Sequence, residues 1–208
     1  MTDCDVILML NTKDFLESEW CGYELEKAHL KRIGIVHLIW PDNDFQNFAQ
    51  LAHSIQLKNG DFDKPLFSDL TKGRLEIEKV KETIDLIESV RARNLAARQD
   101  AIITEFIEAA NYNNIEVNLQ FSRYITENLS NGKRRVYIPT IGVPQSINCF
   151  NSEKLIKKIE KGEIDSIYLI YDEMSIRDYW LEHLEWLNEH LKVQTIKKLN
   201  FNKWLSKL

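Results

Sequence analysis

The chain has 208 residues, a formal net charge of −5 and 44% hydrophobic residues. This length is enough for one large domain or two small ones with a buried core. The acidic balance disfavours a protein that binds nucleic acid or an anionic membrane through a broad basic surface. The 3 cysteines are far apart and form no CxxC pair, which disfavours a disulfide framework and a zinc site. With neither a signal-peptide pattern nor a run of about 18 apolar residues, we expect a cytoplasmic protein without membrane contact.

Two apolar runs with an amphipathic segment between them open the chain. Residues 6–10 and 33–40 are almost wholly apolar, which is typical of parallel strands that are covered on both faces. Between them, Ser18 is a favourable N-cap for a helix, and two basic residues with Gly34 mark its end. A strand, a helix and a strand in this order predict a right-handed crossover, which indicates an α/β fold.

The middle of the chain predicts loops and then a long helical segment. A short helix is expected near residues 47–57, within a stretch rich in turn-forming residues. Residues 74–112 contain neither glycine nor proline and keep helical spacing of apolar residues. Since this exceeds the usual helix length, we expect a break near the basic run 91–98. The expected domains are therefore residues 1–91 and 92–208.

The second half repeats the α/β rhythm. A helix over residues 153–161 would be capped by Asn151 or Ser152, and a helix over 176–191 opens on a capping-box pattern. That capping box consists of Ser175 and Asp178. The expected strands are residues 115–121, 136–141, 166–171 and 194–199, with a last amphipathic turn over 201–208.

Trp20 and Glu24 are the first candidates for chemistry. They are four residues apart, so they share one side of the predicted helix, whereas Cys21, Leu25 and Ala28 form the stripe expected to face the sheet. A carboxylate beside an indole is partly desolvated, which raises its pKa and suits it to the cleavage of a glycosidic bond. The alternative is a structural charge on the helix surface, because other charged residues flank Glu24.

The segments "DVILMLNTKDFLESEWCGYELEKA" and "GIVHLIWPD" resemble a Toll/interleukin receptor (TIR) domain in its bacterial form. That family has an apolar strand, a Ser-Pro-like turn, the motif Ser-x-Trp-Cys-x-x-Glu-Leu and a second apolar strand. Asn11 and Thr12 stand here in place of the usual Ser-Pro. The positions that match the motif are Ser18, Trp20, Cys21, Glu24 and Leu25.

The resemblance implies a flavodoxin-like parallel sheet and NAD as a substrate instead of a cofactor. Glu24 would then be the catalytic residue that breaks the nicotinamide-ribose bond, with Trp20 and Asn11 binding the substrate. It also implies self-association, and a role in bacterial defence against phage. A complete TIR domain has a strand, a helix and a strand before this point. We therefore expect a partial TIR domain over residues 1–91, in a fragment, in a truncated form or in a sheet completed by another element.

In the second half, the ends of two predicted strands are candidate ligand positions. Thr140 and Gly142 lie in a Pro-rich loop after one strand, and Asp172 with Glu173 follows another, where they could receive Mg²⁺ or a ribose hydroxyl. The alternatives are a structural turn and an acidic connecting loop. No GxGxxG or P-loop motif is present.

Two further groups of side chains lack a clear motif. His183 and His190 lack HExxH spacing, so we expect no metal site. The arginines at 91, 93 and 98 could meet phosphate or form salt bridges on a charged helix face.

Three functions remain open on these observations. The first is a TIR-type enzyme that cleaves NAD or takes part in nucleotide signalling. The second is a non-catalytic module that assembles through TIR-type contacts. The third is a ligand-sensing α/β module in residues 92–208, with a ligand that the sequence does not identify.

Overall fold

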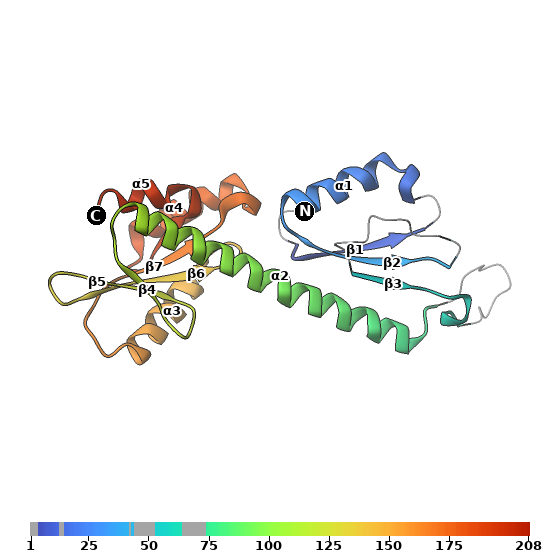
Figure 1. Ribbon diagram of the computed structural model, residues 1–208, viewed down its shortest axis with the longest axis horizontal. Helices are drawn as coiled ribbons and strands as arrows, with labels where there is room; N and C mark the ends of the chain where they lie inside the picture. The colour runs from blue at the N-terminus through green and yellow to red at the C-terminus, as the bar shows by residue number, and fades with distance from the viewer. Residues whose placement is uncertain (1–3, 13–14, 42, 44–52, 64–73) are drawn as a thin grey trace. The chain divides into compact units, whose positions relative to one another are not determined.

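The computed structural model describes residues 4–12, 15–41, 43, 53–63 and 74–208 (Figure 1). Contacts divide the chain into two units, one ending at Ala96 and the other beginning at Ala97. Among the described residues, the first unit contains a three-stranded parallel sheet and the second a five-stranded mixed sheet. The predicted α/β class is therefore confirmed. The sequence placed the boundary after residue 91, inside the same helix.

The first unit is built on the sheet order β1-β2-β3. Strand β1 (Val6–Asn11) pairs in parallel with β2 (Gly34–Ile39), which pairs in parallel with β3 (His53–Gln56). Helix α1 (Glu19–Leu30) joins the first two strands. Two short 3-10 helices, Phe15–Glu17 and Asn59–Asp61, complete the described elements.

The prediction of a short helix near residues 47–57 is wrong for those of its residues that the structure describes. Residues 53–56 form β3, because their backbone pairs with β2 and the side chain of Ile55 is buried against Leu38 and Leu57. Pairing with a neighbouring strand thus overrides the local pattern. Residues 47–52 lie outside the described part of the chain.

Helix α1 has the cap and the buried stripe that the sequence predicts. The Oγ of Ser18 accepts a hydrogen bond from the backbone N–H of Cys21 at 3.4 Å. Cys21, Leu25 and Ala28 pack against the core that includes Met9. The expected facing of this helix is therefore confirmed.

Helix α2 (Ile77–Tyr112) runs without interruption through the boundary between the units. The expected break at the basic run is wrong, because its Arg, Ala and Leu residues favour helix and neither Pro nor Gly interrupts them. Burial does lapse there: Val90 and Ile102 are buried, but no described residue between them is. The change of unit thus falls within this unburied stretch, and the backbone of the helix continues through it.

The second unit has the sheet order β4-β5-β6-β7-β8. The first three strands are antiparallel neighbours, and β6, β7 and β8 are parallel. Strand β5, next to one of the predicted strands, was not expected from the sequence. The strands are β4 (Val117–Leu119), β5 (Ile125–Asn128), β6 (Arg134–Thr140), β7 (Ile164–Tyr171) and β8 (Gln194–Lys197).

Helices of the second unit are α3 (Ser146–Ile159), α4 (Asp178–His190) and α5 (Phe201–Leu205), with 3-10 helices at Glu173–Ser175 and Lys198–Asn200. Two predicted caps are wrong. Helix α3 begins seven residues before the expected position, with Gln145 as its N-cap and a capping box to Asn148. Helix α4 has Arg177 as its N-cap, without a side-chain capping bond, because Ser175 belongs to the preceding 3-10 helix.

An aromatic cluster forms the centre of the second unit. The ring of Phe106 from α2 lies 4.5 Å from Tyr137 and 5.1 Å from Phe201, measured between centroids. Trp204 completes the cluster with an edge-on contact of 4.7 Å to Tyr168. Because aromatic residues bury large apolar areas, this cluster is a major source of stability for the unit.

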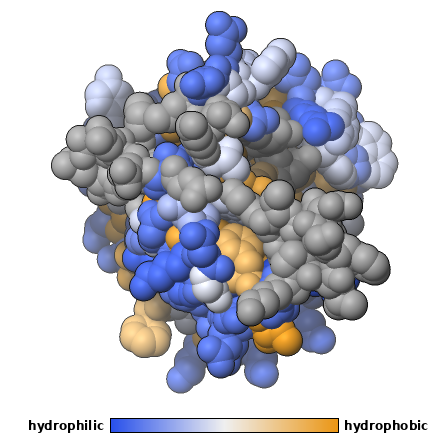
Figure 2. Space-filling view, turned by 90° about the vertical axis from the view of Figure 1, so that its right-hand side faces the viewer, coloured by the Kyte–Doolittle hydropathy of each residue, from blue (hydrophilic) through white to orange (hydrophobic). Residues whose placement is uncertain are grey.

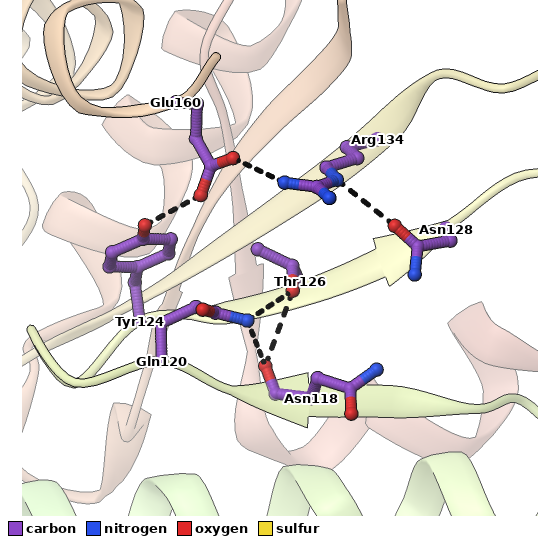
Figure 3. A network of polar contacts seen from close by, with 7 residues as sticks. All are labelled: Asn118, Gln120, Tyr124, Thr126, Asn128, Arg134 and Glu160. Atoms are coloured by element: carbon purple, nitrogen blue, oxygen red, sulfur yellow. Dashed lines mark hydrogen bonds and ion pairs between the residues drawn. The ribbon is translucent and has the colours of Figure 1, made fainter. Parts of the chain in front are cut away.

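A polar network ties the antiparallel strands to the end of α3 (Figure 3). The phenol of Tyr124 donates a hydrogen bond to Glu160 at 2.5 Å, and Arg134 binds the other carboxylate oxygen at 2.7 Å. Arg134 also donates to Asn128 at 3.0 Å. Burial, followed by the bond to Glu160, raises the pKa of Tyr124 to about 12. The buried carboxylate of Glu160 is thus paired with two donors and holds the strands together.

Among the helices described, α2 included, none combines the length with the apolar content that a membrane span requires.

Candidate functional site

Asn11 occupies the carboxyl end of β1, where ligands bind in open α/β sheets. Its side chain is fully buried at 0% exposure. Its Oδ1 accepts a hydrogen bond from Nδ2 of Asn43 at 3.1 Å, and the same Nδ2 donates to the carbonyl of Thr12 at 3.0 Å. The Nδ2 of Asn11 itself has no partner among the described residues. A buried amide with an unused donor is costly, and it marks this strand end as a candidate binding position.

Trp20 and Glu24 lie on the outer face of α1. Trp20 is 78% exposed, and Glu24 is exposed as well, so both can be reached from solvent. The two cavities described below are lined by other residues. The structure thus presents the carboxylate and the indole on one accessible surface, and the described residues build no enclosed pocket around them.

Apolar side chains are also exposed on β1, which is the end strand of the described three-stranded sheet. Leu8 is 39% exposed and Leu10 is 52% exposed, whereas Met9 between them is buried under α1. Figure 2 looks onto the side at which β1, β2 and β3 end, and there hydrophobic side chains appear in separate areas among hydrophilic ones. An end strand with exposed leucines is a candidate surface for association.

A second feature of the first unit is a cationic cavity of about 320 Å³. Its lining includes Arg32, Arg93, His29 and His53, without any carboxylate. It lies at the amino ends of β2 and β3, where Gly34 admits Val90 from α2: a Cβ on this glycine would come within 2.7 Å of Val90. The opposite edge of the sheet carries Asn11, so this cavity does not belong to the Glu24 region.

The arginines on α2 have separate surroundings. Arg91 forms ion pairs with Asp5 at 3.4 Å and with Glu88 at 3.3 Å, which supports the salt-bridge alternative for this residue. Arg93 donates to the backbone and the hydroxyl of Ser89 at 3.3 Å each and has no carboxylate partner among the described residues. Arg93 is therefore available to an anion, but Arg91 is engaged.

The loop positions predicted in the second unit lie at the carboxyl ends of two neighbouring parallel strands. Thr140 ends β6, Gly142 follows with φ of +79°, and Asp172 follows β7. Asp172 accepts hydrogen bonds from Met174 N at 3.0 Å and from Lys198 Nζ at 3.1 Å. The Asp172 carboxylate is thus committed to structural contacts, which favours the connecting-loop alternative for this residue.

A further group of polar side chains gathers beside β8. A cavity of about 310 Å³ lies there, with walls from α4, β8, α5 and the last residue of β7. Burial first, and then the charges of Glu173 and Glu185, raise the pKa of Tyr171 to about 12, whereas the Thr195 hydroxyl acts in the opposite direction. The phenol is therefore neutral at pH 7 and can donate a hydrogen bond. No sequence motif marks this site, because its residues come from separate elements.

Sequence reasoning also missed a buried carboxylate in β5. Glu127 is 8% exposed, accepts a hydrogen bond from the Tyr137 phenol at 2.5 Å and pairs with Arg135 at 3.3 Å. Burial and the bond to Glu127 raise the pKa of Tyr137. Arg135 also lies 3.7 Å from Asp165, so the group is paired and structural. The strand carrying Glu127 was itself not predicted, although the Asn131-Gly132 pair that follows it is a signal for a hairpin.

No group of three or more His, Cys, Asp or Glu residues placed to hold a metal ion occurs in the described part of the chain. His183 and His190 lie instead beside Trp186, with ring centroids 5.9 Å and 4.4 Å away. Nδ1 of His190 also lies 2.8 Å from the Trp186 carbonyl.

Comparison with protein-family models, with curated proteins and with solved structures found no match for this chain.

Proposed function

We propose that the first unit is a TIR-like module that cleaves NAD⁺, or a related nucleotide, at the bond between nicotinamide and ribose. Support comes from the resemblance of the segment around Trp20 and Glu24. The observation that carries the proposal is the buried Nδ2 of Asn11 at the carboxyl end of β1, which has no hydrogen-bond partner among the described residues. A substrate carbonyl or hydroxyl that reached this donor would satisfy it.

In the proposed reaction, the C–N bond breaks and its electron pair leaves with nicotinamide. The ribose becomes an oxocarbenium-like cation, and the Glu24 carboxylate stabilises this positive charge. Water then adds to the same carbon, which gives ADP-ribose and releases a proton. The exposed ring of Trp20 would hold the cationic nicotinamide ring before cleavage, because aromatic faces attract cations.

The exposure of Glu24 implies that this reaction depends on assembly. Catalysis of this kind benefits from the exclusion of water, and the described residues leave Glu24 open to solvent. We assign the missing wall to a second copy of the chain in a head-to-tail contact, in which its exposed Leu8 and Leu10, on the sheet face opposite α1, would cover the outer face of α1 in the first copy. In this proposal, the self-association expected from the sequence is required for cleavage of the nucleotide.

The test is release of nicotinamide from NAD⁺ by the purified chain and by Glu24→Gln. Glu26→Gln is the matched control, because Glu26 is exposed on the same helix and the two changes remove equal charge. We expect Glu24→Gln to lower kcat by about a hundredfold or more, and Glu26→Gln to leave it within about twofold. Equal activity of the two variants would contradict the assignment of Glu24.

A non-catalytic assembly module is the second candidate function, and the solvent exposure of Glu24 favours it. It predicts that the wild-type chain self-associates without releasing nicotinamide, and that Leu10→Asp disrupts the association. Sedimentation velocity on the same samples separates the two candidates. Association with turnover supports the enzyme, and association without turnover at any chain concentration supports the module.

A further inference from the structure

We infer that the cavity beside β8 in the second unit is a binding site for a nucleoside phosphate. Its volume of about 310 Å³ lies at the lower end of the usual range for ligand pockets, so it suits a mononucleotide. The cavity and its residues belong to the second unit alone. The inference is therefore independent of the activity proposed for Glu24.

The charge of the lining favours an anionic ligand. Lys197, Lys203 and Lys207 line the cavity, and Glu185 is the single carboxylate among the lining residues. These three lysines have no ion-pair partner within the described residues. In an acidic chain, three lysines thus line one hollow beside a single carboxylate, and a phosphate group would supply further negative charge.

Lys198, the next residue after Lys197, is an example of a lysine with a structural role. Lys198 pairs with Glu105 at 3.2 Å and with Asp172 at 3.1 Å, and it does not line the cavity. Both acids raise its pKa against the effect of burial. Lys198, which connects α2 to the segment after β7, is thus neutralised by two carboxylates. The three lysines that line the cavity form no ion pair with a carboxylate among the described residues.

One wall of the cavity is aromatic and held in place. Trp204 lines it, and the ring makes edge-on contacts with Tyr168 at 4.7 Å and with Tyr137 at 6.0 Å. These contacts fix the indole before any ligand arrives, so ring ordering adds little cost to binding. Leu181 and Leu184 supply further apolar surface. A flat, partly apolar base can pack on such a wall, which inorganic phosphate alone cannot exploit.

Polar groups with unused capacity complete the site. The Thr195 hydroxyl is buried and lies close enough to the Tyr171 phenol to lower the pKa of that tyrosine, but no hydrogen bond of normal geometry reaches it among the described residues. The neutral phenol of Tyr171 also lines the cavity, as does the amide of Asn200. By contrast, Asn188 is occupied, because its amide bonds both the N–H of Thr195 at 2.6 Å and its carbonyl at 3.0 Å. Ribose hydroxyls would find donors and acceptors at the first three groups.

Isothermal titration calorimetry of the full chain with ADP, adenosine and inorganic phosphate tests the inference. We expect ADP to bind more tightly than either of the other two, and its affinity to fall as salt is raised. No binding of ADP at millimolar concentration would overturn the inference. Inorganic phosphate that binds as tightly as ADP would also contradict it, since the aromatic wall would then contribute nothing.

Charge-removing variants locate the site. Lys203→Ala with Lys207→Ala should weaken ADP binding by about tenfold or more. The matched control is Lys154→Ala with Lys158→Ala, which removes the same charge from exposed positions on α3 and should change the affinity by less than about twofold. An equal loss in both double variants would overturn the site. Glu24→Gln should leave ADP binding unchanged, so failure here is distinguishable from failure of the NAD proposal.

Discussion

The aromatic side chains on α1 and those at the centre of the second unit lie in opposite surroundings. In the first unit, Trp20 is 78% exposed and Tyr23 is 53% exposed, both on the outer face of α1. In the second unit, Phe106 and Tyr137 are fully buried and pack on one another at 4.5 Å. Aromatic residues in a core stabilise the fold, whereas exposed ones are available to a ligand or a partner. The comparison assigns stability to the second cluster and recognition to the first.

Truncating one aromatic residue from each unit gives the largest expected contrast. Phe106→Ala should lower the free energy of unfolding by about 3–5 kcal/mol, because it leaves a cavity among buried rings. Trp20→Ala should change it by less than about 0.5 kcal/mol, because the side chain is mostly in solvent. Urea denaturation monitored by circular dichroism measures both values. A large loss of stability in Trp20→Ala would contradict its assignment to recognition.

Removing one phenolic hydroxyl from each unit sharpens the same comparison at a smaller scale. Tyr137→Phe deprives the buried Glu127 carboxylate of a 2.5 Å hydrogen bond and should cost about 1–3 kcal/mol of folding stability. Tyr23→Phe removes an exposed hydroxyl and should have no measurable effect. Denaturant midpoints at pH 7 compare the two. A neutral Tyr137→Phe would mean that the bond to Glu127 is not needed to satisfy that carboxylate.

Alkaline pH should selectively destabilise the second unit. Burial raises the pKa of Tyr171 to about 12, whereas a tyrosine in an unfolded chain titrates near 10. Above pH 10 the unfolded state therefore binds fewer protons than the folded state, so the stability that this residue contributes falls as pH rises towards 12. Denaturation series between pH 9 and 12 measure this slope. In Tyr171→Phe the slope should be shallower, and an unchanged slope would contradict the buried, neutral phenol.

The smallest expected effect concerns the ends of α1 and α2. Arg32 follows α1 with φ of +52°, and Asn114 follows α2 with φ of +59°. Glycine is favoured in this left-handed conformation, and asparagine tolerates it better than arginine does. Arg32→Gly should raise stability by about 1 kcal/mol, and Asn114→Gly by less. Thermal unfolding of both variants measures the difference, and the reverse order would contradict the account of backbone strain.

Much of the fold could be predicted because its signals are local. Apolar runs predicted β1 and β2, and the Ser18 cap with the stripe of Cys21, Leu25 and Ala28 predicted α1 and its buried face. Strand β3 escaped prediction because its pairing with β2 is not a local signal, whereas β5 was missed although it pairs with its chain neighbours β4 and β6. The continuous helix α2 was broken wrongly, since its length exceeds that of a usual helix and the break was placed at its basic run.

The candidate sites also differ in whether a local sequence pattern could predict them. Trp20 and Glu24 could be proposed from sequence because a short motif contains both. The buried, half-satisfied state of Asn11 depends on Asn43, which is 32 residues away, and no local pattern reports it. The cavity beside β8 gathers lysines, Trp204 and Tyr171 from different elements, so only their placement in three dimensions reveals it.

The central claim is that Glu24 cleaves NAD⁺ within an assembled form, and the most direct test is the specific rate of nicotinamide release against chain concentration. The account predicts a specific rate that rises with concentration and then levels off, and that Leu10→Asp shifts this rise to higher concentration. A specific rate that does not vary with dilution would contradict the need for a second copy. No release at any concentration would contradict the catalytic role itself.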